Sequence, residues 1–534
     1  MTTYIPYLKT GYFSKLICDY LAEKEELQSF YNHFPSLENF GTQLRKKQKS
    51  YASENRAVLA ETLRQYYKGK QVSSQTKMNL ELLSEDSTFT VTTGHQLNLF
   101  TGPLYFLYKI VSAINLAEEL KTQYPNQNFV PVYWMATEDH DFEEINFFNF
   151  KDEKIQWKSE ASGAVGELST EGLETVFQEF SEKMNTSKNA DFLRDLFKNA
   201  YLEHETLAEA TFYIANELFG EYGLICLDAN NSALKRLFIP QIKNELLQQE
   251  SFEKSKLKIQ LLQEKGYSAQ VNPREINLFY LEDNIRERII KEENKFRVNE
   301  TELVFTENEL LDLVEKHPEK FSPNVVMRPL YQEVVLPNLC YIGGGAEIAY
   351  WFELKDYFKA EKIPFPILLL RNSALLISEK QKRKLENIGI AIEDLFLPQT
   401  DLLEKHTKNI SEIKIDFSPQ KQQLEKQFEN LYELAKKTDK SFLGAVSAQE
   451  KKQKNGLAHL EKRLLKAQKR KLNNELERLT NLQDQLFPNQ SLQERHDNFS
   501  MFYLEYGEKL IPKLLEELKP LRLEFQVIWL GELT

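Results

Sequence analysis

The sequence contains little cysteine and no long apolar run. Its 534 residues include three cysteines, Cys18, Cys226 and Cys340, which are far apart and form no CxxC pair. This spacing excludes a disulfide framework and a zinc ribbon. The most apolar run, residues 363–370, ends at Arg371 and is far shorter than the ~20 residues that span a bilayer.

A secretion signal is also missing. The N-terminus reads MTTYIPYLKTGYF and has no basic segment followed by an apolar stretch. We therefore expect a cytoplasmic protein without a membrane partner.

An excess of positive charge is absent as well. Lysine and arginine total 68 against 80 aspartates and glutamates, which gives a net charge of −12. A general nucleic-acid binder needs a basic surface that neutralises phosphates, so we expect no nucleic-acid partner. Hydrophobic residues at 41% and charged residues at 28% are typical of a globular protein.

Standard nucleotide-binding loops are missing too. The glycine run at residues 343–345 is no dinucleotide fingerprint, because Ile348 occupies the sixth position, where Gly or Ala is expected. No GxxxxGK[ST] loop occurs anywhere in the chain. If the protein uses a nucleotide, neither standard loop holds it.

Strands and helices alternate in the middle of the chain. A short β-branched strand at 89–93 precedes a helix from Pro103 to Leu120 and an apolar strand at 129–136. The order returns with a strand at 338–342, a helix at 346–358 and a strand at 366–370, and another strand covers 222–227. Strand–helix–strand units predict an α/β fold with a parallel sheet.

The predicted organisation is a core at 1–375 and a helical C-terminal region at 376–534. Residues 1–85 read as several helices, and the polar stretches 151–215 and 229–325 read as insertions into the sheet. In the C-terminal region a leucine recurs every seven residues within charged sequence, which predicts a coiled-coil hairpin at about 419–487. The heptad leucines are Leu465, Leu472, Leu479 and Leu486.

This leucine seam also predicts a homodimer. The segment 448–486 would be roughly 57 Å long and the helix at 419–437 roughly 28 Å, so half of the seam would stay exposed in a monomer. The alternative is an ordinary amphipathic helix that packs on the core.

The first candidate site segment is residues 93–109, where a strand ends and a helix begins. Ligands of open parallel sheets bind at this edge, and Gly94 and Gly102 allow close backbone approach. The polar candidates here are His95, Gln96, Asn98 and Thr101. Loop and cap chemistry without a ligand is the alternative.

The second candidate is TEDHDFEEIN, residues 137–146, which holds five carboxylates and His140 within 138–144. Three uses compete: binding of a substrate amine, acid/base catalysis by His140 with an acidic partner, and binding of a divalent metal. The structural alternative is helix-start chemistry, with Asp141 as N-cap and Glu144 three residues on. We assign no metal ligand. The candidates are Glu138, Asp139, His140, Asp141 and Asn146.

The third candidate is the glycine run with the residues that follow it. Gly343, Gly344 and Gly345 precede a helix that carries Glu347 and Tyr350. Arg371 and Asn372 follow the last strand, and the planar fork of an arginine there matches a carboxylate. Packing by Tyr350 and an ordinary salt bridge by Arg371 are the alternatives.

The three candidate segments and a fourth segment near the C-terminus together resemble the bacillithiol biosynthesis cysteine-adding enzymes, the BshC family. They are TGHQLNLFTGPLYFLYKI, VPVYWMATEDHDFEEIN, GGGAEIAYWFELKDYF and, at 491–507, SLQERHDNFSMFYLEYG. Two residues depart from the family's pattern, since His95 stands where the family often has Gln and Gly344 stands where it usually has Pro.

The resemblance implies a Rossmann-like core with inserted connecting segments and a dimerising coiled coil. It also implies a ligase that forms an amide between L-cysteine and the glucosamine of glucosaminyl-malate, the last step of bacillithiol synthesis. We expect catalytic roles for His140, Asp139, Glu138 and His95, and substrate-binding roles for the other candidates. Amide formation from a free acid is uphill, so an activating donor is expected; ATP is the natural one, and another activated donor stays open.

Two other functions fit the same residues. One is a nucleotidyltransferase-like enzyme that acts on another sugar or amino acid. The other is a non-catalytic, synthetase-like scaffold that recruits partners through its coiled coil.

Overall fold

The computed structural model describes residues 2–159, 162–282 and 284–531. The chain forms two compact units. The first contains Tyr12–Leu375, the residues before Lys9, and the C-terminal segment that begins at Gln493. The second contains Leu376–Leu492 together with residues 9–11.

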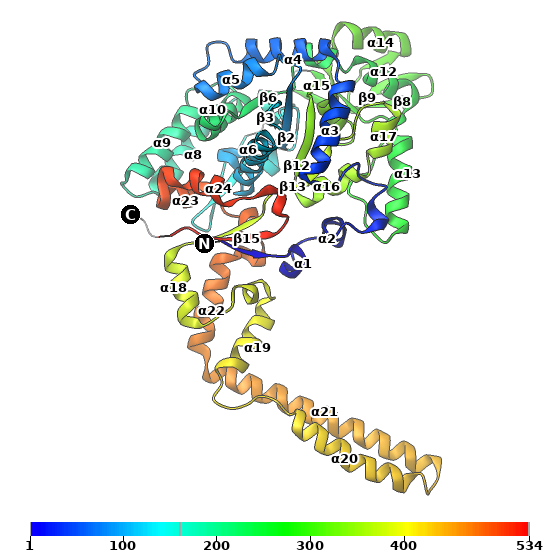
Figure 1. The fold of residues 1–534 in the computed structure, drawn as a ribbon, viewed down its shortest axis with the longest axis vertical. Coiled ribbons are helices and arrows are strands. Elements are labelled where there is room, and N and C mark those ends of the chain that lie inside the picture. The colour runs from blue at the N-terminus through cyan, green and yellow to red at the C-terminus, as the bar shows by residue number, and fades with distance from the viewer. Residues whose placement is uncertain (1, 160–161, 283, 532–534) are drawn as a thin grey trace. The chain divides into compact units, whose positions relative to one another are not determined.

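A five-stranded parallel sheet is the centre of the first unit (Figure 1). Its order is β13-β12-β2-β3-β6, and every neighbouring pair is parallel. The strands are rich in β-branched and apolar residues and are almost entirely buried, as expected of a sheet covered on both faces. Their bounds are β2 (Thr88–His95), β3 (Asn128–Met135), β6 (Ile225–Asp228), β12 (Asn338–Gly343) and β13 (Ile367–Leu370).

The sheet has a topological switch point between β2 and β12. From β2 the chain crosses through α6 (Tyr105–Gln123) to β3 and later β6, whereas β12 and β13 lie on the other side of β2. The carboxyl ends of β2 and β12 therefore diverge into a crevice, where open α/β sheets bind their ligands. Gly94 and His95 end one strand at this crevice, and Gly343 ends the other.

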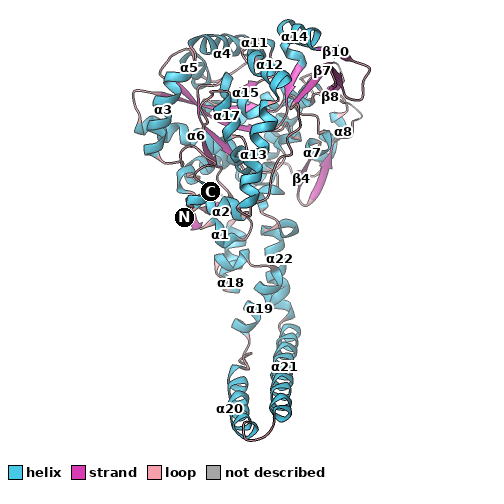
Figure 2. Cartoon of the chain, turned by 90° about the vertical axis from the view of Figure 1, so that its right-hand side faces the viewer, coloured by secondary structure: helices cyan, strands magenta, loops and turns pink. Residues whose placement is uncertain are grey.

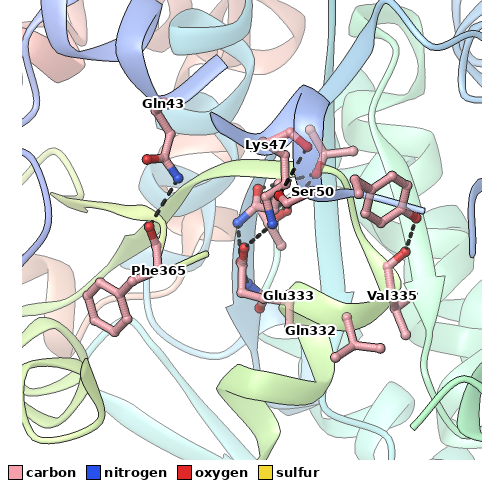
Figure 3. Close-up of polar contacts among 12 residues, drawn as sticks. Gln43, Lys47, Ser50, Gln332, Glu333, Val335 and Phe365 are labelled. Carbon is pink, nitrogen blue, oxygen red and sulfur yellow. Dashed lines mark hydrogen bonds and ion pairs between the residues drawn. The ribbon is translucent and has the colours of Figure 1, made fainter. Parts of the chain in front are cut away.

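Helices at the start of the chain cover part of this sheet. Phe40 and Leu44 of α3 (Leu37–Ser50) pack with Phe89, Val91 and Ile342 in one apolar cluster. The same helix carries a buried lysine, Lys47, whose Nζ lies 2.9 Å from Oε2 of Glu333 on α15 (Arg328–Val335) (Figure 3). The Glu333 carboxylate also accepts hydrogen bonds from Gln332 and Asn338, so this buried charge is fully engaged.

The N-terminal 85 residues are not wholly helical. They form α1 (Tyr7–Thr10), α2 (Lys15–Leu21), α3, α4 (Ser53–Tyr66) and α5 (Ser74–Leu82), but they begin with a strand, β1 (Thr2–Ile5). This strand pairs antiparallel with β15 (Phe525–Trp529), near the other end of the chain. Four residues are too few to show an alternating pattern in the sequence.

The predicted insertions carry secondary structure of their own. The first, with the hairpin before it, contains β4 (Phe147–Phe150), β5 (Glu153–Gln156), α8 (Leu173–Glu182), α9 (Lys188–Tyr201) and α10 (Leu207–Phe219). The second contains α11 (Ser232–Arg236), α12 (Ile239–Gln248), α13 (Glu250–Glu264), α14 (Glu307–Lys316), β7 (Leu278–Glu282), β8 (Ile285–Glu292), β9 (Lys295–Val298), β10 (Val304–Thr306) and β11 (Phe321–Pro323). These five strands form an antiparallel sheet in the order β10-β9-β8-β7-β11.

The structure divides the predicted C-terminal region 376–534 differently. Residues from Gln493 onward belong to the first unit and include α23 (Phe499–Tyr506), α24 (Leu510–Glu517) and strand β15. Their anchors are buried polar contacts, such as the Asn498 side-chain amide, which donates to the Phe100 and Gly102 carbonyls. Helical periodicity alone cannot show to which unit such a segment belongs.

The second unit is helical and contains the predicted hairpin (Figure 2). Helices α20 (Ser418–Ala435) and α21 (Lys440–Lys471) pack together through Leu424, Phe428, Ala435 and Val446. The ion pairs Lys421–Glu461 and Lys454–Glu425 flank this apolar seam, in the manner of a coiled coil.

The expectation that the later leucines of the seam stay exposed in a monomer is wrong. The helix breaks at Leu472, and the remaining leucines continue on α22 (Asn473–Leu486). Leu479 and Leu486 are completely buried, because α22 packs against α18 (Glu379–Ile388) and α19 (Gln399–Ile410) of the same unit. The exposed apolar residues lie instead along the hairpin, at Leu431, Leu434, Phe442, Leu443 and Leu460.

Candidate active site

A cavity of about 400 Å³ opens at the carboxyl ends of β2, β3 and β12. This is the crevice that the switch point creates. Its lining brings together nine of the residues singled out in the sequence: His95, Gln96, Glu138, Asp139, Gly344, Gly345, Glu347, Tyr350 and Arg371.

Glu347 closes the glycine loop at the start of α16 (Gly345–Phe352). Its carboxylate accepts hydrogen bonds from the Gly344 N–H at 2.7 Å and from the Tyr341 hydroxyl at 2.7 Å. Lys109 completes the arrangement, with Nζ 2.6 Å from Glu347 Oε2. Burial alone would raise the pKa of Glu347, but Lys109 and these hydrogen bonds lower it to about 2. The residue is therefore a permanent carboxylate at neutral pH.

Lys109 joins the two loops of the crevice. Besides its ion pair with Glu347, its ammonium donates to the Gly94 carbonyl at 2.7 Å. The end of β2 and the loop after β12 are thus held by one buried cation. Burial lowers the pKa of this lysine, and Glu347 opposes that shift.

Arg328 presents an unused donor to the cavity. It begins α15, and its NH2 group donates to the Tyr350 hydroxyl at 2.5 Å. Its NH1 group is buried and has no hydrogen-bond partner among the described residues. A buried guanidinium nitrogen without a partner is costly unless a ligand satisfies it.

Arg371 is less free than the sequence suggested. Its NH2 lies 2.8 Å from Oε1 of the buried Glu494, and its NH1 donates to Asn372 O and Ser373 Oγ. The outer fork is therefore already occupied, and the unpartnered Nε is what remains. The alternative of an ordinary salt bridge describes this fork better than a carboxylate clamp.

Asn372 serves the fold at this point. Its amide donates to Lys519 O and Gln526 Oε1, and its Oδ1 accepts from Ser112. These hydrogen bonds engage its whole amide group. Asn372 is not among the residues that line the cavity.

The acidic segment after β3 divides into cavity and surface residues. Glu138 forms an ion pair with the buried Lys235. Asp139 accepts from Gln96 Nε2 at 2.9 Å and from the His140 N–H at 2.8 Å. Burial would raise the pKa of Asp139, but hydrogen bonds from His140 and Gln96 hold it well below its usual range.

His140 itself lies outside the cavity lining. Its side chain is 53% exposed, and its Nδ1 lies 2.7 Å from NH1 of Arg286. Arg286 comes from β8, stacks on the Phe279 ring at 3.9 Å, and does line the cavity. His140 therefore reaches the site through this arginine.

Five more predicted residues lie outside the lining. Asp141 takes the N-cap position of the short helix α7 (Phe142–Ile145) but makes no side-chain cap hydrogen bond. Asn146 accepts from Gln156, and Thr101 is buried in a left-handed turn. Gly343 ends β12, and Asn98 lines a neighbouring cavity.

His95 faces the cavity as a neutral imidazole. Burial, helped by Lys109, lowers its pKa well below the usual 6.5. Its Nε2 is buried without a hydrogen-bond partner among the described residues. A neutral imidazole with a free nitrogen can accept a proton.

Several lining residues could not be predicted from the sequence. Lys109 and Tyr105 lie within the first candidate segment, and Arg495 lies in the 491–507 segment, but none was assigned a role. Arg286, Arg328 and Tyr341 belong to no candidate segment. Only the fold brings these residues to the crevice.

The charges of the lining favour an anion. Among the described residues, it contains five cationic side chains, Lys109, Arg286, Arg328, Arg371 and Arg495, and three acidic ones, Glu138, Asp139 and Glu347. Each acidic side chain is already neutralised or hydrogen-bonded within the protein. Fold and site thus define a parallel-sheet α/β protein with a cationic, partly desolvated ligand cavity at its switch point.

Comparisons with known proteins agree with this class. A family model described as "Bacillithiol biosynthesis BshC, N-terminal Rossmann-like domain" matches residues 1–372, and "Bacillithiol biosynthesis BshC, C-terminal coiled-coil domain" matches residues 374–530. The chain belongs to the BshC family of bacillithiol biosynthesis, with a Rossmann-like domain and a coiled-coil domain.

Full-length relatives support the assignment. A Flavobacterium johnsoniae protein is 57% identical and a Christiangramia forsetii protein 56% identical, each over 99% of both chains. A Cytophaga hutchinsonii protein is 38% identical over 96% of both chains. Each of the three carries the name "Putative cysteine ligase BshC".

Two further observations concern the described residues alone. Every helix among them is too short or too polar to cross a membrane. No three of their His, Cys, Asp or Glu side chains are grouped so that they could hold a metal ion.

Proposed function

We propose that this chain is a ligase that joins L-cysteine to the glucosamine of glucosaminyl-malate and so completes bacillithiol. Family membership and the name that its relatives share support this reaction. The observation that carries the proposal is Arg328, whose free NH1 group lies in a cavity with an excess of cationic side chains. A malate carboxylate would satisfy this donor with a charge-assisted hydrogen bond.

His95 is the proposed base. The sugar amine must lose a proton when it attacks the cysteine carbonyl, and the neutral His95 imidazole has a free nitrogen facing the same cavity. Glu138 and Asp139 line the same cavity and, beside the partners that they already have, would attract the ammonium form of the amine before this step. His140 would contribute through Arg286.

ATP is the proposed activating donor. The cysteine carboxylate would attack the α-phosphate and release pyrophosphate, and the sugar amine would then displace AMP to form the amide. The oxygen that amide formation removes leaves on AMP, and the amine proton leaves on the base.

A single assay tests this reaction. Purified protein is incubated with glucosaminyl-malate, L-cysteine and ATP, and the thiol product and nucleotides are quantified. We expect bacillithiol with one AMP and one pyrophosphate per turnover. ADP would indicate an acyl phosphate instead, and amide formation without nucleotide turnover would indicate another donor. No amide under any of these conditions would refute the function.

Cellular thiol profiling separates the ligase from its rivals. Loss of the gene should remove the cysteinylated sugar and let glucosaminyl-malate accumulate. An unchanged thiol pool would favour the non-catalytic scaffold or a nucleotidyltransferase that acts on another substrate.

The working form that we propose is a cytoplasmic homodimer held by the coiled-coil hairpin. The support is the exposed apolar residues of this hairpin, among them Leu434 at 57% and Phe442 at 46% exposure. Exposed apolar surface of this kind marks association sites, and twofold pairing is the commonest way to cover it.

A further inference from the structure

A second cavity of about 450 Å³ adjoins the first. The two share three lining residues, Gln96, Tyr105 and Arg495. The remaining lining comes from Asn98 and Pro103, from α7 and β4, and from the segment after Glu494. None of the residue roles in the proposed reaction uses this space.

Charged side chains of both signs line the second cavity, with Glu143 and Glu144 on the acidic side and Arg495 on the basic side. Glu143 lines it from α7 and forms no ion pair or hydrogen bond among the described residues. Arg495 lines the shared wall and likewise lacks an ionic partner in the described part of the chain. Both charges are therefore free to meet a ligand.

A buried polar atom also points to a ligand here. Asn98 is 7% exposed, and its Oδ1 has no hydrogen-bond partner among the described residues. Its Nδ2 is engaged by the Glu144 carbonyl at 3.3 Å, which leaves an acceptor for a donor such as an ammonium.

Next to Arg495, His496 adds positive character. Its Nδ1 lies 2.9 Å from Asp497 Oδ1, and this hydrogen bond raises the pKa of His496.

We propose that the second cavity is the subsite for a free L-amino acid, with its ammonium at Glu143 and Asn98 and its carboxylate at Arg495. This inference rests on the proposed function and identifies the ligand as the cysteine substrate. A purely anionic ligand would meet repulsion from Glu143, and a purely cationic one from Arg495; a zwitterion satisfies both.

The position of Arg495 gives this subsite a chemical purpose. Because Arg495 lines both cavities, a carboxylate bound to it lies at their junction. That is where an amine held in the first cavity would attack the activated carboxyl carbon. Gln96 forms part of the shared wall and is fixed by hydrogen bonds to Asp139 and Glu144, both 2.9 Å.

Direct binding tests the subsite without any reaction. Calorimetry under reducing conditions compares L-cysteine with cysteamine, which lacks the carboxylate, and with 3-mercaptopropionate, which lacks the ammonium. We expect L-cysteine to bind at least tenfold more tightly than either analogue. Equal affinities for all three would overturn the proposal.

Variants then locate the binding. Glu143→Gln is the cleaner probe, because Glu143 lines the second cavity and not the first. It should weaken L-cysteine binding at least fivefold and leave malate binding unchanged, and Arg495→Gln should also weaken L-cysteine binding. Glu171→Gln and Arg45→Gln are matched controls outside both cavities. Circular dichroism verifies the fold of each variant.

Kinetics separate this inference from the function itself. Glu143→Gln should raise the KM for cysteine while the KM for the sugar substrate stays within twofold. A raised KM for the sugar substrate alone would overturn the subsite and assign the cavity to that substrate. If the wild type forms no amide, the proposed function fails, while the calorimetry still decides whether the cavity binds a zwitterion.

Discussion

Lys109 and Glu347 are separated by 238 positions in the chain, yet their charged atoms lie 2.6 Å apart at the switch point of the sheet. Because Lys109 also holds the Gly94 carbonyl, this pair couples the loop after β2 to the loop after β12. The lysine side chain is 5% exposed and that of the glutamate 25%. Removing one partner of such an ion pair destabilises a protein much more than replacing both partners.

Lys109→Met should destabilise the first unit by about 3 kcal/mol, because it leaves the partly buried Glu347 carboxylate without its counter-ion. The double variant Lys109→Met/Glu347→Gln should regain more than half of that loss. Urea unfolding followed by tryptophan fluorescence measures the effect, since Trp134, Trp157, Trp351 and Trp529 all belong to this unit. Additive losses in the double variant would contradict the coupling.

Arg328→Gln should raise the KM for the sugar substrate on the order of 100-fold, and Arg328→Lys about tenfold, because a point charge replaces a planar fork. Steady-state kinetics measure both values. Arg371→Lys is the contrasting variant: its fork is engaged by Glu494, so the expected effect is lower stability. An unchanged KM in a folded Arg328→Gln protein would rule out a role in binding the malate carboxylate.

His95 should make stability depend on pH. Burial holds the pKa of His95 well below 6.5, so below that pH the unfolded chain binds a proton that the folded chain does not. The free energy of unfolding should therefore fall as the pH drops below 6.5, by up to about 1.4 kcal/mol per pH unit from this residue. His95→Gln should remove this contribution. Urea titrations at pH 7.5 and 5.5 measure it, and identical pH dependence in both proteins would disprove it.

His140 should act as a positioning residue. Direct acid/base catalysis predicts a loss of 10²-fold or more in both His140→Ala and His140→Gln. Because His140 lies outside the cavity and accepts from Arg286, we expect about a tenfold loss of kcat/KM in His140→Ala. His140→Gln should regain most of this activity, because its amide oxygen replaces the acceptor. A loss of 10²-fold in both variants would restore the catalytic role.

The hairpin should control association. Leu434→Glu/Phe442→Glu places charges on exposed apolar positions and should yield a folded monomer, as measured by light scattering and circular dichroism. Leu479→Glu, at a completely buried position, should instead lower the helicity of the second unit. A double variant that stays dimeric, or a wild type that is monomeric at micromolar concentration, would refute the dimer.

The core could be predicted because its signals are local. Short apolar runs predict the positions of β2, β3, β12 and β13 to within a few residues. Parallel strands then place their carboxyl ends at the same edge of the sheet. The candidate residues that line the cavity come from these strand ends, from the segments directly after them and from α16. The pairing of β1 with β15 had no such signal, since both strands are short and they lie at opposite ends of the chain.

The roles of the charged lining residues could not be predicted from local sequence patterns. The sequence places Arg371 at a strand end, but its fork is occupied by Glu494, from a segment more than a hundred residues later. Arg328 lies in no glycine loop or acidic cluster, and only the start of α15 brings it to the crevice. The leucine repeat was real, but a break at Leu472 turns half of it inward within its own unit.

The return of the last residues to the first unit has a consequence during synthesis. Arg371 leaves the ribosome 123 residues before Glu494, the carboxylate that neutralises it. At 5–20 residues per second this interval lasts roughly 6–25 s, during which a future core arginine has no counter-ion. The nascent chain therefore cannot close its ligand cavity early. The hairpin is synthesised between these two residues, so the proposed dimerisation surface is complete before the ligand cavity can form.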